Sequence, residues 1–402
     1  MARQLETDPL PILEALIRCP SVTPDEAGAL GFLEKLFAEK GFECDRLAFA
    51  SPGTPEVQNL FVRIGRSKPH LCFAGHVDVV PPGRSEDWSH PPFAAERADG
   101  YIYGRGASDM KGSVAAFAAA ALDVFGGEEP PAGTLSLLLT ADEEGPAANG
   151  TVKVLEWMSA HGHVPDHCIV GEPTSERLLG DTIKNGRRGS LSFTISIDGV
   201  QGHVAYPHKA DNPIPKLVRL LDRLNSTRPD GGNDAGGRLD NGNEQFEPST
   251  LAITSIDVGN PAGNVIPARA TAKLNIRFNT EHTPESLIAF VVGQCEAVER
   301  ELGGNFTVVE SLAAEAFITE PGPFLGVVLD SIAEETGVSA KLSTTGGTSD
   351  ARFVKNYCPV LEFGPSNATI HQVDERIAVE EIRSLARIYR SIVEKYFQDE
   401  AP

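Results

Sequence analysis

The sequence predicts an α/β protein in which a mixed, mostly parallel sheet is flanked by helices and carries an inserted α+β domain. Three observations support this fold class. Short apolar segments alternate with helical segments over roughly the first 180 residues, and the alternation returns near residue 313. Residues 189–312 instead contain segments in which apolar and polar residues alternate, as in an antiparallel sheet with one exposed face. A length of 402 residues suits two domains better than one.

The first part of the chain predicts helices that alternate with buried strands. Apolar residues recur with helical spacing over Leu10–Arg18 and Ala27–Lys40, and Gly41 stands where a helix commonly ends. Leu71–Val80 is an apolar run that breaks into two prolines and a glycine, which predicts a buried strand. A further helix and two further strands are predicted at Ser113–Phe125, Thr134–Thr140 and His167–Val170. This alternation is typical of a sheet with helices on both faces.

The middle of the chain predicts a smaller domain of a different class. Three segments alternate with a period of two: Ser190–Asp198, Leu251–Asp257 and Ala270–Phe278. Two helical segments accompany them, at Ile214–Leu224 and Pro284–Leu302. Pro229–Asn243 is rich in glycine, asparagine and aspartate and predicts a surface loop. From residue 313 the α/β pattern returns and ends in a helix at Val379–Phe397.

Composition excludes several classes of protein. Lysine and arginine total 35 against 56 aspartates and glutamates, a formal net charge of −21, which argues against nucleic-acid and anionic-membrane partners. The longest apolar run, near Val114–Phe125, has about half of the roughly 20 residues that a membrane span needs, and no signal peptide is visible. The six cysteines form no CxxC pair and are expected to be reduced thiols. We therefore expect a cytoplasmic enzyme that acts on a small molecule.

Histidine and carboxylate side chains follow the predicted strands at their carboxyl ends, where open α/β sheets build their sites. The segment GHVDVV places His76 and Asp78 on one face, roughly 7 Å apart along the strand. Such a pair suits a metal-binding histidine that a carboxylate orients, although alone it fits a hydrogen-bonded core histidine better. In TADEEG, Glu143 and Glu144 diverge, so that one can bind a metal while the other takes up a proton. Glu172 follows the next strand, in IVGEPTS.

Two further candidates lie in loops. Asp109 stands among three glycines in GRGASDMKG, which suits a tight turn with close backbone approach. The spacing matches neither GxGxxG nor the Walker pattern, so a phosphate-binding loop is excluded. His371 lies in ATIHQVDE before the last helix. Taken singly, Glu143, Glu144, Glu172 and His371 each also fit an exposed polar turn.

Two alternatives are set aside. HGHVPDH, residues 161–167, contains the densest cluster of histidines, but it precedes a strand and therefore lies at the wrong end of the sheet. It predicts a polar loop. The chain has no GxSxG segment, which argues against serine-hydrolase chemistry.

The candidate ligands are far more specific as a set than singly: His76, Asp109, Glu144, Glu172 and His371. If Asp109 bridges two ions, each ion has three protein ligands and open positions for water and substrate. Two zinc ions, three carboxylates and a bridging hydroxide sum to neutrality, and zinc lowers the pKa of that water toward 7. The set of ligands therefore predicts two zinc ions per subunit, and the sequence leaves open whether cobalt or manganese can substitute for them. Because the fifth ligand is distant in sequence, convergence of all five makes the middle section an insertion.

These segments, in this order, resemble the co-catalytic zinc family of aminoacylases and carboxypeptidases that carry a lid or dimerisation domain. The resemblance covers nearly the whole chain and rests on HVDVVPPG, GRGASDMKG, TADEEG, GEPT, NGRRGSLSF, GHVAYPH, GNVIPA, STTGGTSDARF and PSNATIHQ. It implies a zinc-exopeptidase-like catalytic domain, residues 1–188 and 313–402, and a lid and dimerisation domain, residues 189–312. The implied activity is hydrolysis of the amide bond in an acylated amino acid.

The resemblance also implies roles around the metals. His76 and Glu172 would bind one zinc ion, Glu144 and His371 the other, and Asp109 both. It further implies a cis peptide bond after Asp109.

Three other residues would take part in catalysis. Asp78 would orient His76. Glu143 would be the general base that activates the bridging water and then protonates the leaving amine. His203 would reach across a homodimer to stabilise the oxyanion in the partner's site, although alone it fits an exposed histidine better.

Seven residues match positions that contact substrate in the family: Arg187, Arg188, Asn264, Arg277, Thr348, Ser349 and Asn367. Arginines suit a substrate with several carboxylates, and the sequence leaves open which of Arg187 and Arg188 points inward. Two alternatives also stay open: a related enzyme with another acyl substrate, and a relative that binds without catalysis. Glu143 argues against the latter, because a protein that only binds does not need a free base.

Overall fold

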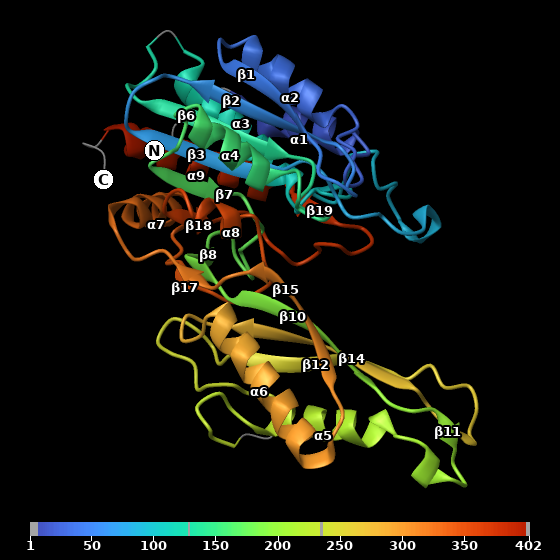
Figure 1. The fold of residues 1–402 in the computed structure, drawn as a ribbon. Coiled ribbons are helices and arrows are strands. Elements are labelled where there is room, and N and C mark those ends of the chain that lie inside the picture. Colours follow the sequence, from blue (N-terminus) through green and yellow to red (C-terminus); the bar gives the residue numbers. More distant parts are fainter. Residues whose placement is uncertain (1–6, 128, 234–235, 399–402) are drawn as a thin grey trace. The chain divides into compact units, whose positions relative to one another are not determined.

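The computed structural model describes residues 7–127, 129–233 and 236–398 (Figure 1). The chain divides into two compact units. Unit 1 comprises Met1–Asn185, Thr319–Ser343 and Ser349–Pro402, and unit 2 comprises Gly186–Ile318 and Thr344–Thr348. The domain borders predicted from the sequence follow residues 188 and 312. The five-residue segment Thr344–Thr348 groups with unit 2, although the sequence predicts it in the catalytic domain.

Unit 1 is built on a mixed sheet. Within the described residues, eight strands join in the order β1-β2-β6-β3-β7-β18-β8-β17. They are β1 (Glu43–Phe49), β2 (Val57–Ile64), β3 (His70–His76), β6 (Thr134–Thr140), β7 (His167–Val170), β8 (Thr182–Lys184), β17 (Lys341–Ser343) and β18 (Val360–Glu362). Strands β6, β3, β7 and β18 run parallel, whereas β1 and β2 add an antiparallel edge. The predicted fold class, a mixed and mostly parallel sheet flanked by helices, is confirmed.

Helices cover both faces of this sheet (Figure 1). They are α1 (Pro9–Ile17), α2 (Ala29–Ala38), α3 (Lys111–Phe125), α4 (Thr151–Ala160), α7 (Pro323–Thr336), α8 (Ala351–Val354) and α9 (Val379–Gln398), with a short 3-10 turn at Ser85–Asp87. Helix α3 is alanine-rich and almost wholly buried between the sheet and its neighbours α1 and α9, which is why its sequence is apolar on every side. None of the helices in the described ranges combines the length and the apolar character needed to cross a bilayer.

Three further strands form a small sheet in unit 1 in the order β19-β5-β4. They are β4 (Glu96–Ala98), β5 (Tyr101–Tyr103) and β19 (Arg376–Ala378). The β5–β19 pair joins two segments that are more than 250 residues apart in sequence. One segment leads into the loop of Asp109, and the other follows the loop of His371.

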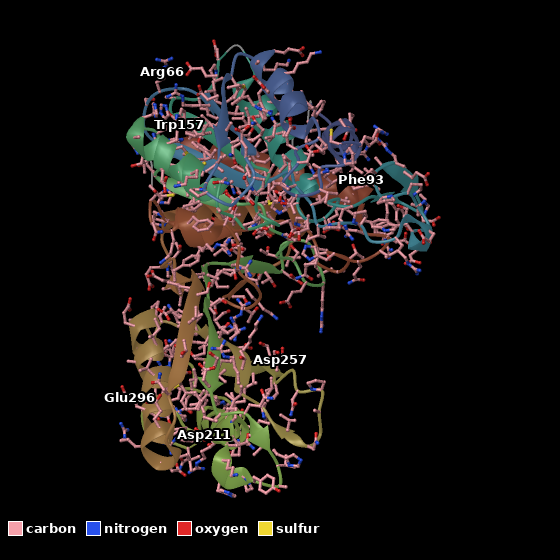
Figure 2. All side chains as sticks on the ribbon, turned by 45° about the vertical axis from the view of Figure 1, so that its right-hand side comes forward. Arg66, Phe93, Trp157, Asp211, Asp257 and Glu296 are labelled. Carbon is pink, nitrogen blue, oxygen red and sulfur yellow. The ribbon has the colours of Figure 1, made fainter. Side chains whose placement is uncertain are left out.

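Unit 2 is an α+β domain. Its main sheet is antiparallel, in the order β12-β14-β10-β15, and two helices pack on one face. The elements are β10 (Gly189–Asp198), β12 (Thr250–Asp257), β14 (Arg269–Phe278), β15 (Phe306–Ala314), α5 (Pro213–Ser226) and α6 (Pro284–Leu302). Smaller strands are β9 (Gly186–Arg187), β11 (Gly202–His203), β13 (Val265–Ile266) and β16 (Phe317–Ile318), with a 3-10 turn at Pro207–Lys209. Polar side chains such as Asp257 and Glu296 lie on the outside of this unit (Figure 2).

Candidate metal centre

The ends of three parallel strands bring the predicted ligands together in unit 1. His76 is the last residue of β3, Glu143 and Glu144 follow β6, and Glu172 follows β7. Because β6, β3 and β7 are neighbours and parallel, their carboxyl ends lie at one edge of the sheet. Asp109 reaches this edge from the turn before α3.

Asp109 lies between the two predicted histidine ligands. Its Oδ1 is 3.3 Å from Nε2 of His76, and its Oδ2 is 3.2 Å from Nε2 of His371. The same nitrogen of His371 is 2.9 Å from Oε1 of Glu144. One carboxylate that presents each oxygen to a different histidine has the arrangement that a bridge between two cations requires.

Two groups of side chains have the spacing of a cation site. His76, Asp109 and Glu144 form one group, and His76, Glu143 and Glu172 form the other, with candidate ligand atoms within 4.8 Å of one another. Glu143 therefore lies beside Glu172, close to the histidine that the two groups share.

The ring of His76 provides a test of whether a cation fits. Its Nδ1 lies 2.8 Å from the backbone carbonyl oxygen of Asp78, which can only accept, so Nδ1 carries the proton. In the neutral ring, Nε2 then presents a lone pair toward the carboxylates. Among the described residues, this buried nitrogen has no hydrogen-bond partner. A cation between the lone pair and the carboxylates would satisfy both, so the residues fit a metal.

The carboxylate of Asp78 has two sets of neighbours, the predicted partner His76 and the backbone of the two glutamates. Its Oδ1 is 3.7 Å from Nδ1 of His76, and the two carboxylate oxygens accept the backbone N–H groups of Glu143 (3.3 Å) and Glu144 (3.1 Å). The backbone carbonyl of Asp78 thus orients the His76 ring, and its side chain holds the backbone of the two glutamates.

The charged groups of the centre shift one another's pKa values. Hydrogen bonds with Asp109 and Glu144 raise the pKa of His371 to about 10. Burial raises the pKa of Glu143 to about 8. Burial also raises the pKa of Glu172, and the charges of Asp109 and Glu143 add to that rise. The raised pKa values mean that Glu143 and Glu172 are hard to ionise side by side. A bound cation would stabilise their ionised forms.

The loop of Asp109 has the close backbone approach that its glycines predict. Gly106 has a φ of +83°, and a Cβ there would lie 2.6 Å from Cγ1 of Val79. A Cβ on Gly112 would lie 2.5 Å from the carbonyl oxygen of Ala107. The peptide bond between Asp109 and Met110 is cis, as the family resemblance implied.

Sequence reasoning missed two carboxylates that hold the ligand loops. Asp142 accepts the backbone N–H groups of three successive residues, 147–149, at 2.8–3.2 Å. Glu375 accepts backbone N–H groups around Asp109. Residue type alone does not distinguish such acids from ligands. Their position could have drawn attention to them, because Asp142 lies in the TADEEG segment of Glu144 and Glu375 lies in the ATIHQVDE segment of His371.

In unit 2 the structure brings together four of the predicted substrate-contacting residues: Arg187, Arg188, Arg277 and Thr348. Nη1 of Arg187 donates to the carbonyl oxygens of Thr345 and Gly347, both at 3.1 Å. Nη1 of Arg277 lies 3.2 Å from the hydroxyl of Thr348. Burial lowers the pKa of Arg277, and the positive charge of Arg188 lowers it further. Among the described residues, neither Arg188 nor Arg277 forms an ion pair.

The remaining predicted residues lie at other positions. His203 and Asn264 are neighbours on the β11–β13 pair of unit 2, where both are exposed and the N–H of Val204 donates to the Asn264 carbonyl over 3.1 Å. Ser349 is 1% exposed, and its hydroxyl donates to Glu362 over 2.8 Å, so that group is already engaged within unit 1. Asn367 is half-buried in unit 1.

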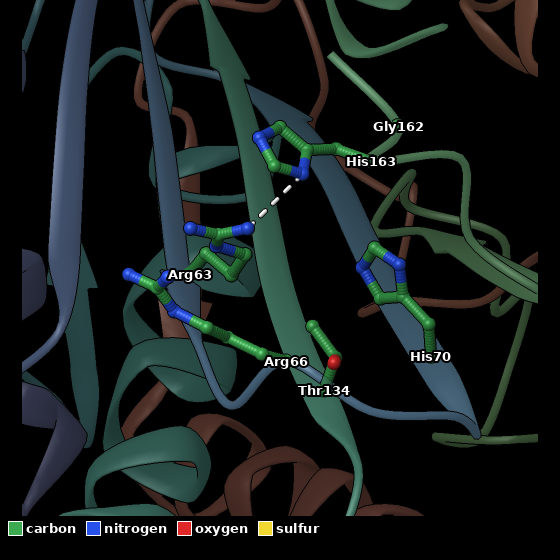
Figure 3. Close-up of a pocket in the computed structure, with 6 residues that line it drawn as sticks. All are labelled: Arg63, Arg66, His70, Thr134, Gly162 and His163. Atoms are coloured by element: carbon green, nitrogen blue, oxygen red, sulfur yellow. Dashed lines mark hydrogen bonds between the residues drawn. The ribbon is translucent and has the colours of Figure 1, made fainter.

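A small pocket of about 150 Å³ lies at the opposite end of the unit 1 sheet, near the start of β3 (Figure 3). Its lining residues are Arg63, Arg66, His70, Thr134, Gly162 and His163. Arg63 donates to Nδ1 of His163 over 3.0 Å, and Glu43 pairs with both guanidinium groups. The HGHVPDH segment thus forms hydrogen bonds and ring contacts away from the metal centre, as the sequence predicted.

Comparison with known proteins assigns the family. A sequence model of the peptidase family M20/M25/M40 matches residues 72–395, most of the chain. The chain belongs to this family. The resemblance predicted from the sequence is therefore confirmed, and the M20/M25/M40 family is metal-dependent, which agrees with the two groups of candidate ligands in unit 1.

Relatives are similar over nearly their full length. The succinyl-diaminopimelate desuccinylase of Parvibaculum lavamentivorans is 52% identical, over 98% of this chain and 97% of its own. That of Rhodospirillum centenum is also 52% identical, over 98% of this chain and 99% of its own.

Two solved structures share the fold of this chain. The aminopeptidase PepT of Bacillus cereus superposes with a TM-score of 0.78 at 21% identity, covering 96% of this chain and 97% of its own. The YXEP protein of Bacillus subtilis, described as a dinuclear metal-binding peptidase of the M20 family, has a TM-score of 0.70 at 16% identity, covering 97% and 98%. Identities this low support the shared fold alone.

Proposed function

We propose that this protein hydrolyses N-succinyl-LL-2,6-diaminopimelate to succinate and LL-2,6-diaminopimelate, a step of diaminopimelate and lysine biosynthesis. The observation that carries the substrate assignment is the 52% identity, over 98% of the chain, to proteins named succinyl-diaminopimelate desuccinylase. The segments RRGS, TTGGTSDARF and NATIHQ favour the same member of the family.

Two zinc ions are the proposed cofactors. His76 and Glu172 would hold one ion, Glu144 and His371 the other, and Asp109 would bridge them. The two oxygens of Asp109, each facing a different histidine, support this division. When bound, the ions polarise the scissile carbonyl and lower the pKa of the attacking water, and cobalt is a proposed substitute for zinc.

Glu143 is the proposed general base. Its carboxylate takes a proton from the water molecule as the water oxygen bonds to the succinyl carbonyl carbon. When the C–N bond breaks, Glu143 returns that proton to the leaving amine, so that the carboxylate is regenerated. Glu143 lies beside His76 and Glu172 but is not one of the five proposed ligands, which supports a carboxylate that is free to take up a proton.

Arg188 and Arg277 are the proposed contacts for the substrate carboxylates. Two neighbouring guanidinium groups without a carboxylate partner suit an anionic ligand that supplies one. Arg187, which is engaged with the backbone at 345 and 347, would instead shape the segment that carries Thr348. Asn264, Ser349 and Asn367 stay predicted contacts.

A homodimer formed through unit 2 and a cytoplasmic location complete the proposal. Strand β12 is a sheet edge, and its Ile256 is 58% exposed, which favours pairing with another chain. In that dimer His203, exposed on β11, would stabilise the oxyanion in the partner's site. Sedimentation at several concentrations tests the dimer, and His203→Ala should then lower turnover without changing the assembly.

A turnover assay tests the proposed reaction. The zinc-loaded protein is compared on N-succinyl-LL-2,6-diaminopimelate and N-acetylornithine at matched concentrations. We expect strong preference for the succinyl substrate. Preference for acetylornithine would keep the chemistry but overturn the substrate assignment, and inactivity on both with zinc bound would overturn the function.

A further inference from the structure

Glu375 bonds to the backbone next to the candidate metal centre, and it is not one of the five predicted ligands. It is fully buried, and so is its partner Arg105, at 0% and 3% exposure. Glu375 Oε2 accepts from Arg105 Nη1 at 2.8 Å and from the backbone N–H of Gly106 at 3.0 Å. Glu375 Oε1 accepts from the backbone N–H groups of Ser108 and Asp109, at 3.0 and 3.1 Å. One buried carboxylate therefore fixes the backbone that carries the bridging acid.

The guanidinium of Arg105 extends these contacts to the loop of His371. Its Nη1 donates to the carbonyl oxygen of Gln372 at 3.1 Å, and its Nη2 to that of His371 at 3.5 Å. His371 has a φ of +59°, in the left-handed region that non-glycine residues adopt only when their surroundings favour it. Arg105 supplies such surroundings by donating to the carbonyl groups of His371 and of the residue that follows it.

Further bonds join the same two segments. The N–H of Gly104 donates to the carbonyl of Glu375 at 2.9 Å, and the hydroxyl of Ser108 donates to that of Arg376 at 3.0 Å. Strand β5 then pairs with β19. Asp109 and His371 are 262 positions apart in sequence, yet their loops are fastened to each other beside the point where their side chains meet.

We propose that Glu375 and Arg105 are positioning residues that set the spacing of the two metal ions by locking the Asp109 loop to the His371 loop. This inference rests on the proposed two-metal centre. Asp109 serves both ions, so Glu375 controls the affinity for both. Arg105 contacts the His371 loop directly, so its loss acts mainly on the ion that His371 holds.

Glu375→Gln is the decisive variant. Both carboxylate oxygens accept from N–H groups, so the amide nitrogen of glutamine faces a donor in either orientation. We expect the affinity of each zinc ion, measured by competition with a chromophoric chelator, to fall about 10–100-fold. The visible absorption of the cobalt-loaded protein should change with it, because that spectrum reports ligand geometry.

Glu335→Gln is the matched control. Glu335 pairs with Arg387 over 2.6 Å between α7 and α9, is 11% exposed in its side chain, and lies away from the ligand loops. The Glu335→Gln substitution also removes an ion pair. It should therefore lower the unfolding temperature, while the affinity for zinc stays at the wild-type value. Wild-type affinity in Glu375→Gln, or an equal loss in both variants, overturns the proposal.

Arg105→Lys is a second variant that tests the proposal if Glu375→Gln does not fold. A single ammonium cannot span Glu375 and two carbonyl groups, so one of the two zinc ions should be lost first on titration with chelator. Loss of both ions together, or of neither, overturns the role of Arg105. None of these measurements uses the succinyl substrate, so a wild-type protein that binds two ions but does not cleave it would remove the proposed function and leave this inference standing.

Discussion

At the scale of single residues, Glu143 and Glu144 are neighbours with different surroundings. Glu144 faces His371 at 2.9 Å, whereas Glu143 lies beside Glu172 and His76. Glu143→Gln keeps the shape of the side chain but cannot accept a proton from water. We expect kcat to fall by about 10²–10⁴, because proton transfer by a placed base contributes that much. Steady-state kinetics on the succinyl substrate measure the change.

Zinc content separates this role from that of a ligand. Glu143→Gln should still hold two zinc ions per subunit by atomic absorption, whereas Glu144→Gln should lose the ion shared with His371. Full turnover in Glu143→Gln would refute its assignment as the base.

Arg187 and Arg188 are also neighbours, and the structure gives Arg187 two bonds to backbone carbonyl groups. Arg188→Met should raise KM about 10–100-fold with little change in zinc content, because the substrate loses a charge-assisted hydrogen bond. Arg187→Met removes two bonds to backbone carbonyls and should lower thermal stability as well as affinity. Initial rates over a range of substrate, with a thermal melt, measure both. A normal KM in Arg188→Met would assign the contact to another residue.

The side chains that meet at the candidate metal centre could be selected from the sequence, but the groups that hold their loops could not. A histidine or acid directly after an apolar run signals a site, because strand ends meet at one edge of a sheet. Glu375 and Asp142 act by accepting backbone N–H groups. That role depends on loop geometry, which residue type does not encode, so only the structure separates them from exposed acids.

At the scale of elements, predictability depends on how fully a strand is buried. Thr134–Thr140 is buried throughout, and its predicted bounds agree with β6. Strand β1 at the sheet edge is half exposed and carries charged residues, so its sequence gives no clear pattern. The apolar run from Leu71 to Val80 leaves the sheet after His76, because Val79 bonds instead to Ser21.

A buried histidine between strands β3 and β6 makes the free energy of unfolding depend on pH. Burial lowers the pKa of His70 to about 4, and its Nε2 lies 2.7 Å from the hydroxyl of Ser136. The unfolded chain titrates near 6.5, so between pH 6.5 and 4 it binds a proton that the folded protein refuses. This histidine's contribution is therefore present above pH 6.5 and is lost as the pH falls.

His70→Gln should remove that dependence. The free energy of unfolding of the wild type, relative to the variant, should drop by up to about 3 kcal/mol between pH 7 and pH 4. Denaturant titrations at several pH values measure the difference. A difference that does not vary with pH would show that the pKa of His70 is the same in the folded and the unfolded protein.

At the scale of the whole molecule, the metal centre gathers negative charge in a chain that is already at −21. Four carboxylates surround two histidines in unit 1: Asp109, Glu143, Glu144 and Glu172. Bound cations would offset this repulsion, and their binding energy would add to the stability of the folded state. At a free zinc concentration 1,000-fold above Kd, each ion would contribute about 4 kcal/mol.

Removing the metal should therefore lower the unfolding temperature, and by more at higher pH. In the metal-free protein the raised pKa values of Glu143 and Glu172 mean that the folded state binds protons that the unfolded state releases above about pH 4.5. The free energy of unfolding of the metal-free protein is thus highest at low pH and falls as the pH rises toward 8.

Zinc binding acts in the opposite direction, because its ligands must lose protons first. Thermal melts with zinc and with chelator, at pH 6 and pH 8, should show a gap that widens with pH, and a constant or narrowing gap would contradict a centre in which metal replaces protons.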